Sequence, residues 1–282
     1  MFKEIPDALW EKVQPLLAPF QRRRPGGKKP LAQRQVLNGI LYVLITGCQW
    51  SMLPRCYGSK SSVHEHFQCW VSAGVFDQVL LLCLEYYDEL KGIDWQWQSM
   101  DGCLLQAPGC SKDPEEGVGS NPTDRGRPGT KWHPLVDEQG IPLCIQVCGA
   151  NVHDSRLVSS TVAALVIEMP DPPETSHPET SHPETSHLCL DKAYDYPRVH
   201  EEVASLGYQA HIKQRGIQEE ATCLPDGTRY PARRWVVERT FAWLKAYRGI
   251  RTRFTRKLAN YQALVHLACA LLIFGKAVAQ EM

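Results

Sequence analysis

The spacing of apolar residues divides the chain into a helical N-terminal part and a mixed remainder. Before residue 90, apolar residues recur every three or four positions in several stretches, which are interrupted by residues 25–27, Gly47 and Gly74. This period is typical of amphipathic helices, and glycine commonly ends them. Residues 1–90 are therefore expected to form a small all-α domain, built from short helices around tight turns.

From residue 94 the period becomes strand-like. Residues 94–101 alternate, and two apolar runs flank the polar turn 137–140, which predicts a hairpin. Residues 103–129 are rich in Gly, Pro, Ser and Asp and are expected to form a long loop. The predicted order is strand, hairpin, helix, strand, helix, strand, helix, which is that of a ribonuclease-H-like α/β core, a mixed sheet flanked by helices, over residues 94–282. The ranges are 94–101, 131–136 with 141–147, a helix capped by Asp154 or Ser155 and running to 167, 188–190, a helix after Pro197, 209–213, 234–247 and a final helix at 258–275.

One segment follows neither period. Residues 173–187 are three perfect copies of Pro-Glu-Thr-Ser-His. Because proline every five residues excludes a regular helix or a central strand, residues 171–187 are expected to form a solvated loop lengthened by tandem duplication. The repeated histidines, His177, His182 and His187, could also bind a metal, but the surface loop is the favoured interpretation.

Composition excludes several classes of protein. The chain has 282 residues, 43% of them hydrophobic, and no run of 18 apolar residues, so no membrane span is expected. The N-terminus lacks the basic-then-apolar layout of a signal peptide. The eleven cysteines include no C-x-x-C pair, which favours reduced, buried thiols and a cytoplasmic protein.

The net charge is zero, but the cations are clustered. A basic block near the N-terminus includes Arg22, Arg23 and Arg24, and residues 229–257 contain ten Lys or Arg with a single acid, Glu238. A solvated charged face would explain one such run. Two runs, one of which encloses a lone carboxylate, favour a nucleic-acid partner.

The lone acid lies on a distinctive helix face. At 100° per residue Arg234 stands at about 0°, Glu238 at about 40° and Lys245 at about 20°, while the apolar residues of the same helix fill the arc from about 180° to 340°. One carboxylate is thus flanked by two cations at the border of a buried face. Glu238 could also be a simple helical partner of Arg234.

Two further carboxylates follow apolar strands. Asp101 precedes Gly102, and Asp191 comes directly after residues 188–190. An Asp-Gly pair is also common in turns, but ligand sites in α/β sheets lie beyond the carboxyl ends of strands. Converging carboxylates repel one another unless a cation neutralises them, and Mg²⁺ is held by one or two carboxylates with substrate phosphates. A second phosphate-binding segment is expected at Arg125, Arg127 and Lys131.

These segments carry a family resemblance. The chain closely resembles bacterial DDE transposases of the insertion-sequence 4 and 5 superfamily, in its insertion-sequence 5-like group, over nearly its whole length. The N-terminal match lies in residues 36–50 and corresponds to the helical, helix-turn-helix-like DNA-binding region of such proteins. The segments that recur in order are Asp101-Gly102, residues 124–131 (DRGRPGTK), 150–155 (ANVHDS), 191–195 (DKAYD) and 234–245 (RWVVERTFAWLK).

The resemblance implies a metal-binding catalytic triad of Asp101, Asp191 and Glu238. It implies two Mg²⁺ ions, for which Mn²⁺ can substitute, cleavage at the element's terminal inverted repeats by water, and attack of the 3′-hydroxyl on target DNA. A homodimer on DNA is expected, with no membrane and no small-molecule cofactor, in the cytoplasm with the bacterial nucleoid. DNA contacts are expected from Arg234, Lys245, Arg239 and the basic residues named above. The family signature also has a tyrosine three positions before the arginine, where this chain has Pro231, with Tyr230 one residue early.

Two alternatives remain open from the sequence. One is a transposase-derived DNA-binding protein without activity, which represses transposition. The other is a metal-dependent, structure-specific nuclease on the same core, which would cut without joining strands. Residues 60–66 are expected to enter the DNA groove.

Overall fold

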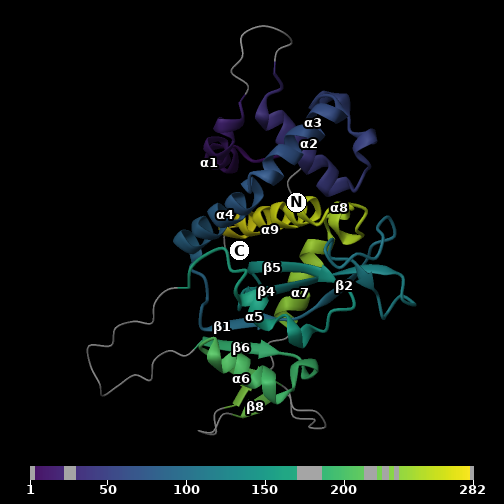
Figure 1. Ribbon diagram of the computed structural model, residues 1–282. Helices are drawn as coiled ribbons and strands as arrows, with labels where there is room; N and C mark the ends of the chain where they lie inside the picture. The colour runs from purple at the N-terminus through teal and green to yellow at the C-terminus, as the bar shows by residue number, and fades with distance from the viewer. Residues whose placement is uncertain are drawn as a thin grey trace. The chain divides into compact units, whose positions relative to one another are not determined.

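The computed structural model describes residues 4–21, 30–169, 186–212, 221–223, 229–231 and 235–279 (Figure 1). The chain divides into two compact units. The helical unit comprises Met1–Lys91, Gln106–Ser111 and Trp243–Met282, and the sheet unit comprises Gly92–Leu105 and Lys112–Ala242. The expected linear division near residue 90 therefore differs from the observed one, since the C-terminal forty residues belong with the N-terminal helices.

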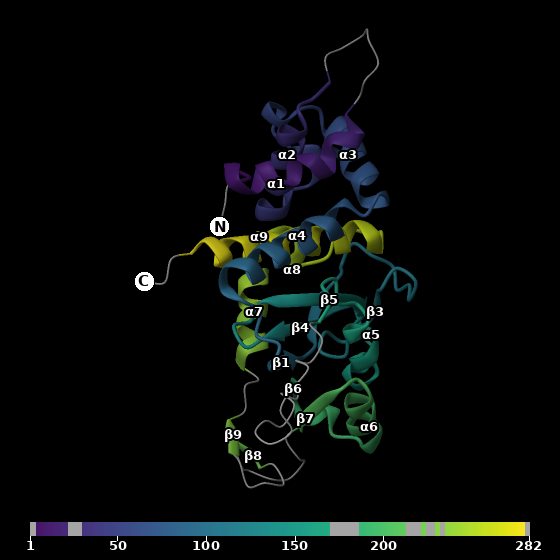
Figure 2. The same cartoon turned by 90° about the vertical axis from the view of Figure 1, so that its left-hand side faces the viewer.

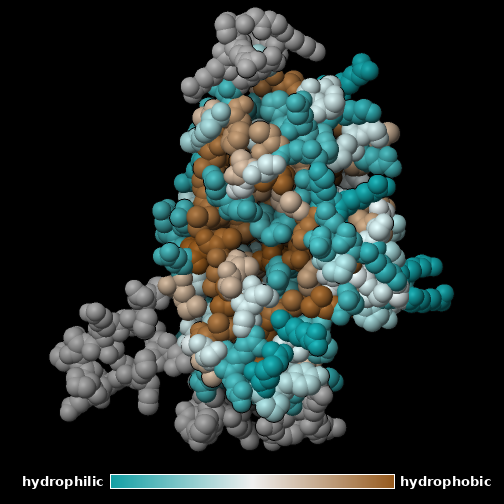
Figure 3. Space-filling view, viewed as in Figure 1, coloured by the Kyte–Doolittle hydropathy of each residue, from teal (hydrophilic) through white to brown (hydrophobic). Residues whose placement is uncertain are grey.

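The helical unit is built around a long apolar helix, α9 (Leu258–Val278), which lies alongside α4 (Val75–Lys91) in both views (Figures 1 and 2). Every residue of α9 from Ala263 to Phe274 is buried, which explains why it needs partners on several sides. The rings of Tyr86 and Phe274 stack with centroids 5.8 Å apart. Hydrophobic residues also reach the surface over α4 and α9 (Figure 3). The other helices are α1 (Asp7–Leu17), α2 (Gln33–Thr46), α3 (Lys60–Ser72) and α8 (Arg248–Arg251), with 3₁₀ turns at Ala18–Phe20, Trp50–Met52 and Arg55–Tyr57.

By length and hydropathy alone α9 could cross a membrane, with a mean hydropathy of 1.6 in its most apolar window. That window is 67% buried within the protein, as in the core helix of a soluble protein. The sequence predicts no membrane-spanning segment, whereas the structure contains one helix that is long and apolar enough to span a membrane. The burial of α9 within the protein explains its apolar composition.

The sheet unit contains a seven-stranded mixed sheet with the main order β2-β4-β1-β6-β7, in which β3 and β5 also pair with β4. Strand β1 is antiparallel to β4, β4 is antiparallel to β5, and β6 and β7 run parallel to β1. This order and these directions are those of the ribonuclease-H-like core expected from the sequence. The strands are β1 (Trp97–Met100), β2 (Cys103–Gln106), β3 (Gly119–Ser120), β4 (Pro128–Asp137), β5 (Pro142–Gly149), β6 (Ser186–Leu190) and β7 (Tyr208–Ile212).

Helices flank this sheet on its two faces (Figure 2). On one face, α5 (Val158–Val162) and α6 (Pro197–Ser205) enclose a core that includes Met100, Leu135 and Leu188. On the other face lies α7 (Trp235–Lys245), whose Thr240 hydroxyl donates to the Gly140 carbonyl at 2.6 Å. A separate two-stranded sheet pairs β8 (Ala221–Cys223) with β9 (Arg229–Pro231).

Three sequence expectations are corrected here. The segment 103–129 is not wholly a loop, because β2 and β3 lie in it and pair with β4. The helix expected to reach residue 167 is a 3₁₀ turn at Asp154–Arg156 followed by α5, which ends at Val162, and its side-chain cap comes from His153, which accepts from the Ser155 amide.

The third correction concerns the repeat. Residues 170–185 lie outside the described residues, but the last two residues of the third copy form the start of β6. His187 is buried, its ring stacks on Trp97 with centroids 4.2 Å apart, and its Nδ1 lies 2.8 Å from Nε2 of His211. The final histidine therefore belongs to the sheet rather than to a solvated loop, because β6 lies between β1 and β7 and both of its faces are covered.

Candidate functional site

Two aspartates come directly after neighbouring parallel strands. Strand β1 pairs with β6 in a register that places Ser99 beside Cys189. Asp101 and Asp191 each lie two residues further on and thus hold equivalent positions at one edge of the sheet. Neighbouring strands are about 4.8 Å apart, so the two backbones reach this edge side by side. Both side chains belong to residues of intermediate exposure, which keeps them accessible to solvent ions.

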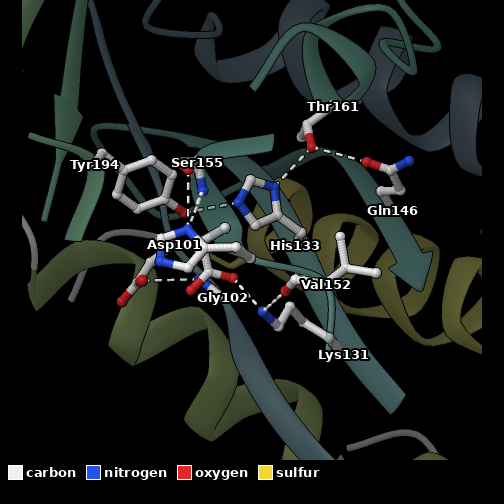
Figure 4. Close-up of polar contacts among 11 residues, drawn as sticks. Asp101, Gly102, Lys131, His133, Gln146, Val152, Ser155, Thr161 and Tyr194 are labelled. Carbon is white, nitrogen blue, oxygen red and sulfur yellow. Dashed lines mark hydrogen bonds and ion pairs between the residues drawn. The ribbon is translucent and has the colours of Figure 1, made fainter. Parts of the chain in front are cut away.

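The turn after β1 depends on a glycine. Oδ1 of Asp101 accepts the Gly102 amide at 2.8 Å, which orients the carboxylate (Figure 4). A Cβ added at Gly102 would lie 2.3 Å from Oδ1 of Asp154, so no larger residue fits unless that carboxylate moves. Glycine is required here by the close approach of Asp154, rather than by backbone freedom alone.

Lys131 holds Asp154 in that position. The Lys131 ammonium lies 2.5 Å from Oδ1 of Asp154 and also donates to the Val152 carbonyl at 2.5 Å, and only 5% of its side chain is exposed (Figure 4). Its expected role in phosphate binding is therefore corrected, because the ammonium is buried and occupied by protein acceptors. Lys131 instead fixes the carboxylate that packs against the Asp101–Gly102 turn.

A buried hydrogen-bond chain supports the second aspartate. The Tyr194 amide donates to the Asp191 carbonyl at 2.9 Å within the 3₁₀ turn Lys192–Tyr194. The Tyr194 hydroxyl lies 2.7 Å from Nε2 of His133, and Nδ1 of His133 lies 2.7 Å from the Thr161 hydroxyl (Figure 4). Thr161 in turn donates to Gln146 at 3.1 Å, so one consistent arrangement has Tyr194 donating to His133 and His133 donating to Thr161.

Both titratable groups of this hydrogen-bond chain, His133 and Tyr194, are held in their neutral forms. Burial lowers the pKa of His133 to about 3, with a further lowering by the Lys131 charge. Burial also raises the pKa of Tyr194 well above its ordinary value, and the negative charges of Asp154, Asp101 and Asp191 raise it further. Tyr194 therefore stays protonated as a donor beside the carboxylates. Sequence reasoning missed His133 and Tyr194, whose only signals were their places within strand β4 and the 191–195 segment.

Glu238 is not gathered with the two aspartates. It is exposed in the first turn of α7, as the helix-face pattern predicts, while Val236 and Val237 are buried. The next residue, Arg239, donates to the Gln139 carbonyl at 2.7 Å, and the β1–β4 register puts that turn at the opposite end of β1 from Asp101. Across the described parts of the chain, no three His, Cys, Asp or Glu side chains lie close enough together to hold a metal ion.

The candidate cations fall into three groups. Arg125 and Arg127 are exposed on a turn closed by Asn121, and Arg127 lies 3.9 Å from Asp124. Lys245 is exposed at the end of α7. The Arg239 guanidinium packs 4.8 Å from the centroid of the Trp235 ring, so part of its capacity is used within α7. The remaining candidates, Arg22, Arg23, Arg24 and Arg234, lie outside the described residues.

The donor chemistry at the sheet edge fits a divalent cation. Mg²⁺ is bound through one or two protein carboxylates, with substrate phosphates and water completing its shell. Asp101 and Asp191 supply two such carboxylates from adjacent strands. The ten cysteines whose side chains are described form no disulfide, and burial raises the pKa of Cys83 and Cys144 to about 12, so these thiols offer no competing soft site.

Comparison with known proteins places the chain. A family model described as "Putative transposase of IS4/5 family" matches residues 5–80, and one described as "Transposase DDE domain" matches residues 98–273. A Burkholderia cepacia protein, "Putative transposase for insertion sequence element IS402", is 34% identical over 158 residues, which are 56% of this chain and 69% of that protein. A second protein of the same organism, "Insertion element IS402 uncharacterized 16.2 kDa protein", is 33% identical over 133 residues, covering 42% of this chain and 90% of the relative.

Among solved structures, "Crystal structure of a pre-cleavage Mos1 transpososome" aligns with 93% of this chain and 84% of its own, at 9% identity and a TM-score of 0.26, too low to support a structural conclusion. The sequence matches are decisive without it, because one family model spans more than half of the chain and covers β1, β6 and α7. The chain belongs to the DDE transposases of the IS4/5 type.

Proposed function

We propose that this protein binds the terminal inverted repeats of its insertion sequence, cleaves the DNA there and joins the ends to target DNA. The observation that carries the proposal is the register of β1 and β6, which brings Asp101 and Asp191 to equivalent positions at one sheet edge. In a family defined by acidic residues of this kind, paired carboxylates at a strand edge are suited to phosphodiester chemistry.

In this proposal Asp101, Asp191 and Glu238 hold divalent metal, Mg²⁺ or Mn²⁺, together with phosphate oxygens of the DNA. Two such ions, when bound, activate an attacking oxygen and stabilise the leaving one. The protein's own part is to keep both aspartates oriented, through the Gly102 amide and the turn that carries Tyr194. Glu238 is exposed on α7 and lies apart from the two aspartates in this structure, so its place in the triad rests on the family motif.

Exposed cations have a second role. Arg125 and Arg127 on their turn, Lys245 on the helix of Glu238, and Arg234, which lies outside the described residues, are proposed to bind phosphates near the scissile bond. The N-terminal helices are proposed to read the inverted repeat, with α3 in the groove. Because two ends must be joined, we infer that the protein acts as a homodimer on DNA, in the cytoplasm with the nucleoid.

The test is a cleavage and strand-transfer assay on DNA that carries the element's own ends, with Mg²⁺, comparing wild type with Asp191→Asn and Glu238→Gln. Joined products from wild type alone would support the proposal and both residue assignments. Tight, specific binding without cutting by all three proteins would instead favour the inactive DNA-binding alternative. Cutting without joining would favour the nuclease alternative.

If Glu238→Gln cuts like wild type while Asp191→Asn does not, the site would consist of the two aspartates without α7. The matched control is Glu201→Gln, an exposed glutamate on α6 outside the proposed site. Its cleavage and joining are expected to equal those of wild type.

A further inference from the structure

A buried arginine fixes the segment between α8 and α9. Arg253 has no exposed surface, its Nε donates to the Thr255 carbonyl at 3.0 Å and its Nη2 donates to the Arg256 carbonyl at 3.0 Å. Its guanidinium also lies 4.9 Å from the centroid of the Tyr261 ring. Because a buried charge is costly unless it is bonded in this way, residues 252–257 are tied to one conformation by a side chain that cannot contact a ligand itself.

The backbone of this segment is attached as well. The Arg253 amide donates to the Gln106 carbonyl at 2.8 Å, and the Cys110 thiol lies 3.6 Å from the Thr255 carbonyl. All of these residues belong to the helical unit. The segment is therefore a fixed platform rather than a loose connection.

The platform displays an aromatic ring. Phe254 is 66% exposed, although the residue before it is fully buried. Its ring passes close to Gly109, where an added Cβ would lie 3.4 Å from a ring carbon. Burying a phenylalanine removes a large apolar surface from water and stabilises the folded protein, but the fixed platform leaves this ring in solvent.

Cations lie close to Phe254 on both sides in the sequence. Arg251, Arg256 and Lys257 are all exposed, and no acidic residue occurs between positions 239 and 280. After burial, the charge of Lys257 is the second cause that lowers the pKa of His64, so Lys257 lies within electrostatic reach of α3. The start of α9, which follows the platform, packs beside the end of α3, since Ala259 and Gln262 line one cavity with Val71. The platform therefore adjoins the helix expected to enter the DNA groove, and both belong to the helical unit.

We propose that Phe254 stacks on an unpaired or unstacked base of DNA, while Arg251, Arg256 and Lys257 hold the phosphates around it. This inference rests on the proposed function and adds to it a contact with an unstacked base. The cations select a polyanion, but a phenyl ring gains nothing from phosphate. The apolar faces of DNA are those of its bases, which a side chain can reach only where the stack is opened.

The test measures binding of the full-length protein to two labelled duplexes. One carries the terminal inverted repeat with its flanking DNA, and the other has a short mismatched run at the junction of repeat and flank. Wild type is expected to prefer the mismatched duplex, and Phe254→Ala is expected to lose about tenfold in affinity for it. Phe254→Trp should keep the preference and Phe254→Leu should lose it, because stacking needs an aromatic face.

Salt dependence separates the ring from the cations. Phe254→Ala should leave the slope of log affinity against log salt unchanged, whereas Arg256→Ala should reduce it by about one, the contribution of one phosphate contact. The matched control is Leu90→Ala. Leu90 is also an exposed apolar residue of the helical unit, 51% exposed, but it lies at the end of α4 remote from the start of α9. This variant should bind both duplexes like wild type.

Equal preference in wild type, Phe254→Ala and Phe254→Leu would overturn the inference. Since Phe254 is mostly exposed, the thermal midpoint should not change, and the Trp and Leu variants keep the test decisive if the Ala variant is unstable. If wild type cleaves and joins ends but Phe254→Ala binds normally, only this inference fails. If wild type prefers opened DNA through Phe254 but never cuts, only the proposed chemistry fails.

Discussion

Burial shifts the pKa values of two groups of the sheet unit, His133 and Asp137, in opposite directions. In mildly acidic solution their effects on the free energy of unfolding should therefore cancel. Burial lowers the pKa of His133 from 6.5 to about 3. Burial raises the pKa of Asp137 from 3.8 to about 7, even though the Ile141 amide donates to its Oδ1 at 2.8 Å. Oδ2 of Asp137 is buried without a hydrogen-bond partner among the described residues, which fits a carboxyl that carries its proton there.

The sign of each contribution follows from the protons bound. Between about pH 5 and 6.5 the unfolded chain carries from half a proton to nearly one proton more at His133 than the folded protein does, so this residue makes the folded state less stable as the pH falls. In the same window the folded protein carries one more proton at Asp137, so that residue makes it more stable as the pH falls. Each slope is about 1.4 kcal/mol per pH unit, or about 2 kcal/mol across the window.

Asp137→Asn should therefore expose the acid sensitivity of His133. Relative to wild type, the free energy of unfolding of this variant should fall by about 2 kcal/mol from pH 6.5 to about pH 5. His133→Gln should change by the same amount in the opposite direction, and the double variant should follow wild type. Urea unfolding followed by tryptophan fluorescence at several pH values measures these differences, in which the groups common to both proteins cancel.

Parallel pH profiles for wild type and Asp137→Asn would refute the assignment. They would mean that Asp137 is ionised in the folded protein across this pH window, because His133 is common to both proteins and cancels in the comparison. A constant offset between the two parallel profiles would reflect altered packing and would not rescue the assignment, because equal slopes mean equal proton binding.

The other predictions concern the supports of the site and the repeat. Lys131→Met should lower the free energy of unfolding by about 2–4 kcal/mol in chemical denaturation, since it leaves the carboxylate of Asp154 unpaired; an unchanged value would mean that the pair is solvated. Gly102→Ala should reduce cleavage of end DNA more than it reduces DNA binding, because its Cβ displaces Asp154; equal losses of both would point to misfolding. Deleting residues 173–182 should leave the thermal midpoint unchanged, whereas His187→Ala, which removes a buried ring stacked in the sheet, should lower it; a large loss on deletion would show that the repeat is structural.

Much of the sheet unit was predictable from local pattern. Alternation marked the end of β1 at Asp101, and the polar turn after Asp137 marked the β4–β5 hairpin. The helical period gave α7 with Glu238 and Lys245 on its exposed side. These features depend on residues within one element, so the sequence contains the whole signal.

Long-range contacts account for the failures. Lys131 looked like a phosphate ligand because its partner, Asp154, lies 23 residues away. His133 and Tyr194 are 61 residues apart, and neither has a periodic signal that would connect them. The period of α9 showed a buried helix but could not show that its core is shared with α4 in the helical unit.

Asp101 and Asp191 are each held in place by a different set of contacts, so substitutions in the two sets should act independently. Asp101 depends on the packing of Asp154 against Gly102, whereas Asp191 depends on the turn held by Tyr194 and His133. These supports involve no residue of α7, whose hydrogen bonds from Arg239 and Thr240 to the turn 139–140 lie at the other end of β1 from Asp101. The sheet therefore sets the geometry of two carboxylates before any substrate binds, while the third is set by a separate helix. Changes in the supports should reduce stability and cleavage together, whereas changes at Glu238, an exposed residue, should reduce cleavage with little loss of stability.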